Sequence, residues 1–219
     1  MPSTWLIWQL ADSAFPTGGF AHSLGLESAW QAGEVPDADA LGRFLRGAVW
    51  QTGYGVLPLA SAAFREPARL APLDALAEAF LTNPVANRTS RVQGRALLST
   101  CARIWPSDGL SALQVQTGTL AGHAGPLSGA VFLAIGLPLR TMQALLLFAT
   151  ARGVLSAAVR LGIVGSYQAQ RMQVGAASDL TAVLDRCADL DEDDLAHASP
   201  IVDLLQSGHD RLYSRLFQS

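Results

Sequence analysis

Apolar residues recur at helical spacing along most of this chain, and proline or glycine separates one repeat from the next. Between Asp39 and Gln51, for example, apolar side chains fall three and four residues apart, and Asp37 precedes them as an N-cap. The sequence contains no convincing strand-like alternation. The pattern predicts one all-α domain over residues 1–219, a bundle of about ten helices. The expected helical segments before the tail are 4–13, 20–31, 39–51, 58–65, 73–80, 85–105, 110–120, 126–136, 138–164 and 166–190.

The two most hydrophobic segments, 126–136 and 138–164, are expected to form the centre of the fold. Pro138 and several arginines interrupt this region, so it predicts buried core helices and no membrane span. The first helix, rich in tryptophan, is expected to be buried on more than one side. Phe20, Leu24 and Trp30 are expected core positions of the second. Small residues at helical spacing predict close helix approach, at Gly118, Gly122, Gly125 and Gly129.

Composition excludes several chemistries. The chain is 50% hydrophobic and 15% charged. Its net charge of −3 is not the excess of positive charge that is typical of nucleic-acid-binding proteins. All 15 basic residues are arginine, which excludes a lysine-containing phosphate-binding loop and a lysine Schiff base. Cys101 and Cys187 are expected to be small buried residues in a reducing compartment. With no signal-peptide pattern at the start, a cytoplasmic location is expected.

A breaker cluster at residues 16–19, Pro-Thr-Gly-Gly, lies between two helical segments and is followed by His22, Ser23 and Glu27. These polar groups raise the possibility of a small helical hydrolase. However, adjacent side chains on a helix point about 100° apart, and the sequence has no G-x-S-x-G elbow. We therefore expect no catalytic residue here. The cluster is interpreted as a corner that sets the relative orientation of the first two helices. His22, Ser23 and Glu27 are interpreted as capping and interface groups around it.

No metal site or cofactor is expected. No pair among His22, His123, His197 and His209 has the spacing of a helical or zinc-type site. The acidic run from Asp189 fails as a calcium loop, because its sixth position is aspartate and its twelfth is proline.

Two features allow a structural and a functional interpretation. Arg88, Arg91 and Arg95 share one helix face, which is either a solvated face or a docking stripe for carboxylates or an acidic partner.

The tail, residues 199–219, carries aromatic and arginine side chains at helical spacing. It is either a final helix packed on its own domain or a segment that anchors a partner and folds on binding.

Four motifs, in order along nearly the whole chain, resemble one protein family. DSAFPTGGFAHSLGLE at residues 12–27 and SPIVDLLQSGHDRLYSRLFQS at residues 199–219 are similar to the two terminal signatures of the urease accessory protein UreF. SRVQGRALL and AAVRLGIVGSYQAQR between them also fit.

The resemblance implies a non-enzymatic, all-helical protein that forms a homodimer. It would bridge UreD (UreH in some systems) and the GTPase UreG, and couple GTP hydrolysis to nickel insertion into the urease apoprotein. An alternative is a direct nickel-binding carrier, suggested by the four histidines. The implied partner-binding residues are Pro16, Gly18, Phe20, His22, Ser23, Gly25, Glu27, Arg91, Gln93, Gly94, His209, Tyr213, Arg215, Leu216 and Phe217.

Overall fold

The computed structural model describes residues 4–218, and within them every regular element is helical. The α-helices are α1 (Thr4–Ala11), α2 (Leu26–Gln31), α3 (Ala38–Gly55), α4 (Leu57–Arg65), α5 (Leu70–Phe80), α6 (Pro84–Ile104), α7 (Asp108–Thr117), α8 (Ala124–Ala134), α9 (Leu139–Arg160), α10 (Ser166–Gly175), α11 (Ala177–Cys187) and α12 (Pro200–Ser207). Short 3-10 helices are η1 (Gly19–Ala21), η2 (Pro67–Arg69), η3 (Glu192–Asp194) and η4 (Gly208–Arg211). The predicted all-α bundle is confirmed.

Side-chain caps fix several helix starts. Asp37 accepts a hydrogen bond from the Ala40 amide at 2.9 Å at the start of α3, as its position predicts. Ser107 caps α7 in the same way, by accepting from the Leu110 amide at 3.3 Å. These caps satisfy amide groups that have no partner inside the helix.

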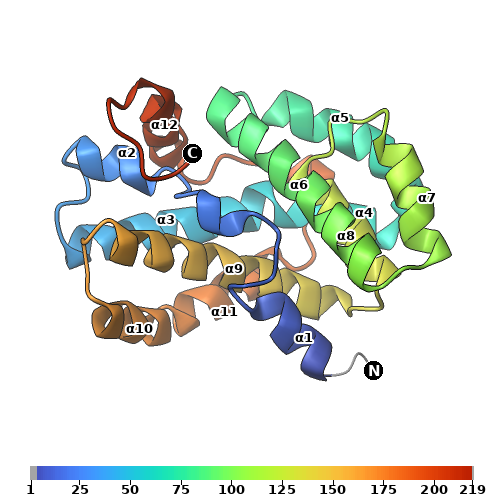
Figure 1. The fold of residues 1–219 in the computed structure, drawn as a ribbon, viewed down its shortest axis with the longest axis horizontal. Coiled ribbons are helices and arrows are strands. Elements are labelled where there is room, and N and C mark those ends of the chain that lie inside the picture. Colours follow the sequence, from blue (N-terminus) through green and yellow to red (C-terminus); the bar gives the residue numbers. More distant parts are fainter. Residues whose placement is uncertain (1–3, 219) are drawn as a thin grey trace.

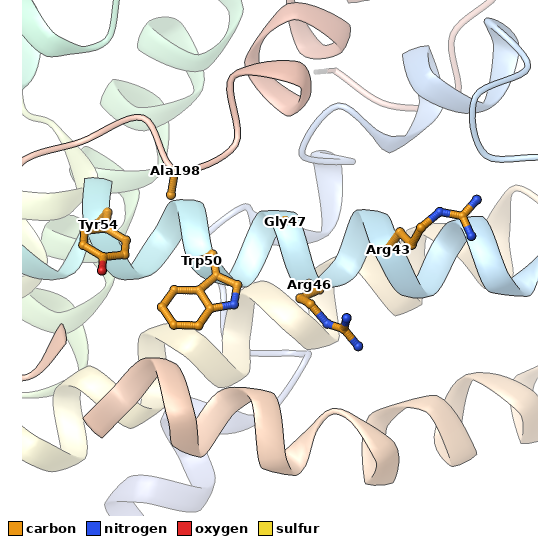
Figure 2. Close-up of a pocket in the computed structure, with 6 residues that line it drawn as sticks. All are labelled: Arg43, Arg46, Gly47, Trp50, Tyr54 and Ala198. Atoms are coloured by element: carbon orange, nitrogen blue, oxygen red, sulfur yellow. The ribbon is translucent and has the colours of Figure 1, made fainter. Parts of the chain in front are cut away.

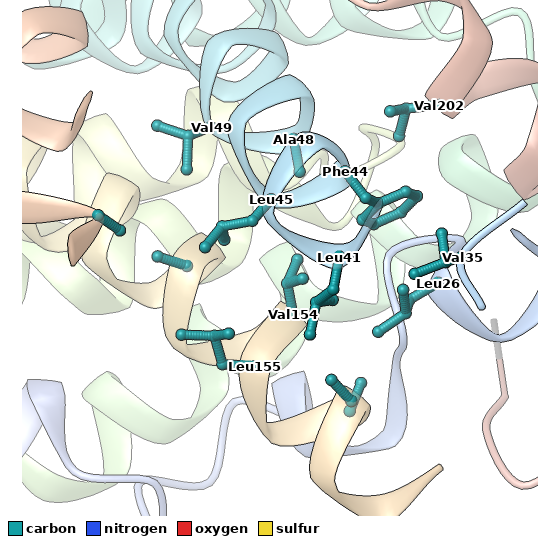
Figure 3. Packing of buried hydrophobic residues seen from close by; sticks show 14 of the residues in the cluster. Leu26, Val35, Leu41, Phe44, Leu45, Ala48, Val49, Val154, Leu155 and Val202 are labelled. Carbon is teal, nitrogen blue, oxygen red and sulfur yellow. The ribbon is translucent and has the colours of Figure 1, made fainter. Parts of the chain in front are cut away.

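The core is built around α9 and α8. Helix α9 lies beside α3 and also contacts α10 and α11, while α8 packs against α4 and α6 (Figure 1). Figure 3 shows Leu41 and Leu45 of α3 packed with Val154 and Leu155 of α9. A second cluster centres on α8, where eight of the eleven residues are buried. The prediction that these two segments form the centre of the fold is confirmed.

Helix α9 is also long and apolar enough to cross a membrane by length and composition alone. Half of its most apolar window is buried against other helices, as in a core helix of a helical bundle.

Close helix contact occurs where glycine was expected to allow it. A Cβ at Gly129 would lie 2.0 Å from the Ala60 carbonyl oxygen of α4, and one at Gly125 would lie 3.4 Å from the Leu59 side chain. Helices α4 and α8 therefore touch backbone to backbone, which only glycine permits at Gly129.

Three local expectations are wrong. Residues 20–31 are not one helix, because Leu24 and Gly25 have left-handed backbone angles (φ 55° and 86°) that delay α2 until Leu26. Residues 166–190 form two helices, separated at Ala176. The expected break at Gly53-Tyr54-Gly55 falls one residue later, at Val56.

Several aromatic side chains expected in the core are at the surface. Phe20 is 64% exposed and Trp30 is 39% exposed. Trp5 and Trp8 also point outward, because α1 packs through one face only, that of Leu10. Periodicity shows that a helix has an apolar face, but it does not show how many faces the fold covers.

Candidate partner-binding surface

The two ends of the chain meet at one place. The corner, defined here as residues 16–27, lies against the strap, defined here as residues 208–218, beside α2 and α12 (Figure 1). Thr100 of α6 holds the start of the corner by donating to the Pro16 carbonyl oxygen at 2.8 Å.

Glycine shapes the corner. Gly18 has φ 75°, which turns the chain into η1. At Gly25 a Cβ would lie 2.9 Å from Cβ of Gln206, so α12 approaches the corner more closely than any side chain would allow. The close contact places the start of the strap directly over the corner.

Glu27 links the corner to the end of the strap. Its buried carboxylate accepts backbone hydrogen bonds from Leu216 at 2.6 Å and from Phe217 at 3.1 Å. Carboxylate acceptors make stronger hydrogen bonds than neutral ones, and here the bonds lie in a site with little water. Ser23 is also fully buried, and its hydroxyl accepts from the Glu27 amide at 3.4 Å, in line with the predicted capping role.

Further contacts run along the strap. Gln218 donates its amide to the Ala21 carbonyl oxygen at 2.8 Å, and the Gln31 side chain donates to the Ser214 carbonyl oxygen at 2.9 Å. Phe217 is buried, with the Arg160 guanidinium 4.1 Å from its ring centroid. The same guanidinium lies 4.0 Å from the Phe20 ring centroid, so one cation is shared by both ends of the chain.

Ionisable groups concentrate under the strap. His209 is fully buried, with Nδ1 3.9 Å from a Glu27 carboxylate oxygen, and neither ring nitrogen hydrogen-bonds to any described residue. The pKa of His22 lies below its ordinary value because burial disfavours its charged form, and because His209 and Arg88 lie nearby. Arg88 holds the pKa of Asp210 below its usual range by hydrogen bonds of 2.9 and 3.2 Å.

Apolar side chains project from the outer side of the same region. Ile201 and Leu204 of α12 are 71% and 70% exposed, Leu216 is half-exposed, and Tyr213 is fully exposed. Large aliphatic and aromatic groups exposed on the strap and on α12 are typical of surfaces that a partner covers.

Two other hollows lie away from this outer surface. Figure 2 shows a cleft of about 410 Å³ on α3, lined by Arg43, Arg46, Gly47, Trp50, Tyr54 and Ala198. Arg46 is paired with Asp179 at 3.1 Å, so part of its positive charge is already balanced. An apolar cavity of about 170 Å³ lies between α3, α6, α8 and α12, and Gln93 lines it.

Among residues 4–218, no group of three or more histidine, cysteine, aspartate or glutamate side chains is placed to hold a metal ion. His209 nevertheless lies close enough to His22, from the other end of the chain, to help lower the pKa of His22.

Comparison with known proteins decides the family. Residues 35–177 match the family model described as UreF. The chain is 36% identical to Urease accessory protein F of Oryza sativa subsp. indica, over 98% of this chain and 85% of that protein. It is 35% identical to Urease accessory protein F of Arabidopsis thaliana, over 98% and 92%, and 34% identical to Urease accessory protein UreF of Arthrobacter sp. (strain FB24), over 96% and 95%. The chain belongs to the UreF family. Its role is therefore in urease maturation.

The structure brings together two of the three groups of residues that the UreF resemblance implied. The corner and the strap are in direct contact, through residues such as Glu27 and Phe217. The third group lies on α6, where Gln93 lines the apolar cavity together with Leu24 of the corner and Gln206 of α12. Gly94 packs on the backbone of Gly122 and His123, Gln93 faces the cavity, and Arg91 is exposed.

Sequence reasoning missed a hydrogen-bonded network in this UreF-family chain. His123 is fully buried, with Nδ1 3.2 Å from the Ser90 hydroxyl and Nε2 2.7 Å from Glu78. That hydrogen bond lowers the pKa of Glu78. The Ser90 hydroxyl also accepts from the Ala124 amide at 3.1 Å, so it caps α8, and Asp74 accepts from the His123 amide at 2.7 Å.

This network contains serine, histidine and a carboxylate in the order of a hydrolase triad. Its acid is half-exposed and its imidazole is fully buried, however, whereas a triad buries the acid and presents the imidazole to substrate. The arrangement therefore ties α5, α6 and α8 together. In the sequence His123 stood out only as one of four histidines, and nothing linked it to Ser90 or Glu78.

Proposed function

We propose that this chain is a non-enzymatic scaffold for urease maturation in the cytoplasm. It bridges UreD (UreH) and the GTPase UreG, forms a homodimer, and couples GTP hydrolysis to nickel insertion into the urease apoprotein. The single observation that carries the proposal is the docked strap, which presents exposed apolar groups while its own backbone is held by the corner. A surface arranged in this way suits a protein partner better than a small substrate.

UreD is the partner assigned to this surface. Tyr213 and Leu216 lie on the strap, and Ile201 and Leu204 continue the apolar surface onto α12. A few buried side chains, aromatic ones above all, carry most of the binding free energy in typical interfaces, and Tyr213 is a side chain of that kind. These exposed groups support the anchoring role that we propose for the tail from its aromatic and arginine content.

The test is co-purification of the full chain with UreD at pH 7.5. Deletion of residues 210–219 is expected to abolish the complex, and the pair of substitutions Tyr213→Ala and Leu216→Ala to weaken it at least tenfold. Val174→Ala is the matched control, because Val174 is 77% exposed on α10 and outside the strap. Undiminished capture of UreD by the truncated chain would remove the assignment.

The three arginines of α6 that could contact UreG differ in the partners that they already have within this chain. Arg88 is paired with Asp210, and Arg95 donates to the carbonyl oxygens of Leu120 and Ala121 at 2.7 and 3.0 Å. Arg91 makes no direct hydrogen bond or salt bridge among residues 4–218, and lies close enough to Glu78 to help lower the pKa of that carboxyl. It is the arginine of the stripe that we assign to UreG. Arg91→Ala is expected to change UreG binding or turnover more than Arg88→Ala or Arg95→Ala. Identical GTPase kinetics for all three variants would reject the stripe.

The nickel-carrier alternative has one observation in its favour: His209 lies close enough to His22 to help lower its pKa. Calorimetry with nickel on the isolated chain tests it. Binding tighter than tens of micromolar, roughly −6 kcal/mol, that is lost in His22→Ala would favour the carrier. Weaker binding would reject it and leave the scaffold proposal unaffected.

A further inference from the structure

The apolar cavity beside α12 has no role in the proposed function. Its volume is about 170 Å³, and residues of α3, α6, α8 and α12 line it. Much of the lining is aliphatic or aromatic, with side chains such as Leu59, Phe80 and Val202. An apolar cavity of about 150 Å³ is large enough to hold benzene. The space in this protein therefore fits one small molecule about the size of an aromatic ring.

Several polar side chains around the cavity already have partners within the chain. The hydroxyl oxygens of Thr52 and Thr150 lie 3.0 Å apart in a shared hydrogen bond. The side-chain carbonyl oxygen of Gln51 accepts from the Ser199 amide at 2.9 Å. These groups hold the helices around the cavity together, so they are poorly placed to bind an occupant as well.

Two glutamine amides in the lining are different. Gln206 of α12 is 7% exposed, Gln93 of α6 is half-buried, and neither side chain hydrogen-bonds to any residue from 4 to 218. The base of the Gln206 side chain is fixed, because its Cβ would lie 2.9 Å from a Cβ placed on Gly25. A buried amide without a partner is unfavourable, and a molecule in the cavity that carries a donor or an acceptor would satisfy it.

The charge of the lining favours a neutral occupant. Asp203 is the single ionisable side chain among the described residues that line the cavity, and its carboxylate oxygen lies 2.8 Å from Nδ1 of His197. An anion would be repelled by this carboxylate, and a cation would find it already paired. Burying an ion without a partner of its own is unfavourable, whereas a neutral molecule avoids that cost.

We propose that the cavity is a binding site for one neutral, ring-sized molecule that carries a single hydroxyl or amide group. The apolar lining takes the ring, and the polar group exchanges hydrogen bonds with the side-chain amides of Gln206 and Gln93. Because these two residues belong to α12 and α6, the occupant touches both helices. The site is independent of the proposed function, since neither the strap nor a protein partner takes part in it.

The test titrates three probes into the full-length protein at pH 7.5 and follows backbone and glutamine side-chain amides by two-dimensional NMR. Phenol carries a ring and a hydroxyl group, benzene carries the ring alone, and benzoate adds a charge. Phenol is expected to shift the resonances of residues that line the cavity and to bind about two- to tenfold more tightly than benzene, the range for one neutral hydrogen bond. Benzoate is expected not to bind in the cavity.

Three results of the titrations would overturn the proposal. The first is no binding of phenol up to about 10 mM, which corresponds to a very weak site. The second is equal affinity for phenol and benzene, because the glutamine amides would then contribute nothing. The third is binding of benzoate in the cavity as tightly as phenol, because the site would then not select a neutral molecule.

Two variants and a control locate the bound molecule. Gln206→Met removes the amide and keeps a side chain of similar length, so most of the advantage of phenol over benzene is expected to disappear. Ala86→Leu places a larger side chain in the lining and is expected to abolish binding of both probes. Gln170→Met is the matched control, because Gln170 is exposed on α10 and outside the cavity.

The two variants can each decide the question alone. If circular dichroism shows that Ala86→Leu does not fold, the phenol-to-benzene ratio in Gln206→Met is decisive. A ratio equal to that of the parent places the hydroxyl group away from Gln206 and overturns the proposal. Undiminished phenol binding in a folded Ala86→Leu variant places the probe outside the cavity and overturns it too.

Discussion

Glu27→Gln is the substitution that most directly tests how the strap is held. The glutamine side chain keeps the size of the glutamate but replaces one carboxylate oxygen with an NH₂ group. In the parent, one oxygen accepts from the Leu216 amide at 2.6 Å and the other from the Phe217 amide at 3.1 Å. In the variant, one of these backbone amides would face the NH₂ group of the glutamine, which cannot accept a hydrogen bond. The other amide would donate to a neutral oxygen in place of a charged one.

A hydrogen bond to a charged group contributes about 1.5–3 kcal/mol. Loss of one such bond, together with weakening of the other, gives an expected change of about 2–3 kcal/mol in the free energy of opening the strap. Since about 1.4 kcal/mol corresponds to a factor of ten, protection of these two amides should fall about 30- to 150-fold.

Hydrogen exchange at pH 7.5, read at Leu216 and Phe217, measures this quantity directly. Asp179→Asn is the control, because it removes a carboxylate from an exposed ion pair with Arg46 that is remote from the strap. Exposed pairs contribute about 0–1 kcal/mol, so strap protection should not change in the control. If Glu27→Gln leaves protection of both amides at the parent level, the carboxylate does not hold the strap.

Three further outcomes are expected. Gly129→Ala should destabilise the fold by about 2–3 kcal/mol, measured by urea unfolding, because its new Cβ would collide with the α4 backbone. Gly175 has open space around it, so Gly175→Ala should leave the urea midpoint unchanged or raise it. Ser90→Ala should lower the free energy of unfolding by about 1–2 kcal/mol, measured by thermal unfolding, because α8 loses its cap. Hydrolysis of p-nitrophenyl acetate should equal the buffer blank in the parent and in the variant. A rate that depends on Ser90 would show that the network is catalytic. Cys101, whose pKa burial raises to about 12, should react with Ellman's reagent at pH 8 only after denaturation, and rapid reaction in the native protein would contradict its burial.

Much of the helical architecture could be predicted from hydrophobic periodicity, because most segments bury one face. The errors occur where an unusual backbone conformation decides where a helix begins, or where the packing of other elements decides whether a side chain is buried. Leu24 adopts a left-handed angle that its residue type does not suggest, which delays α2. Trp30 lies on an apolar pattern, but it is 39% exposed near the end of α2.

The functional surface was less accessible to sequence reasoning. Glu27 and Phe217 are 190 positions apart, and no local pattern encodes their hydrogen bond. The family resemblance named both residues without placing them together. Arg160 gave no signal, since its two ring contacts depend on how α9 passes beneath both ends of the chain.

The hydrogen bonds from Glu27 to the strap also bear on how the protein is made. During synthesis Glu27 is added 189 and 190 residues before the two residues whose amides satisfy its carboxylate. Until then the carboxylate needs water, so the corner cannot close in its final form. A chain that stops before residue 216 would lack both donors and could not finish the corner. Closure of the corner thus depends on synthesis of residues 216 and 217, at the surface where the partner is proposed to bind.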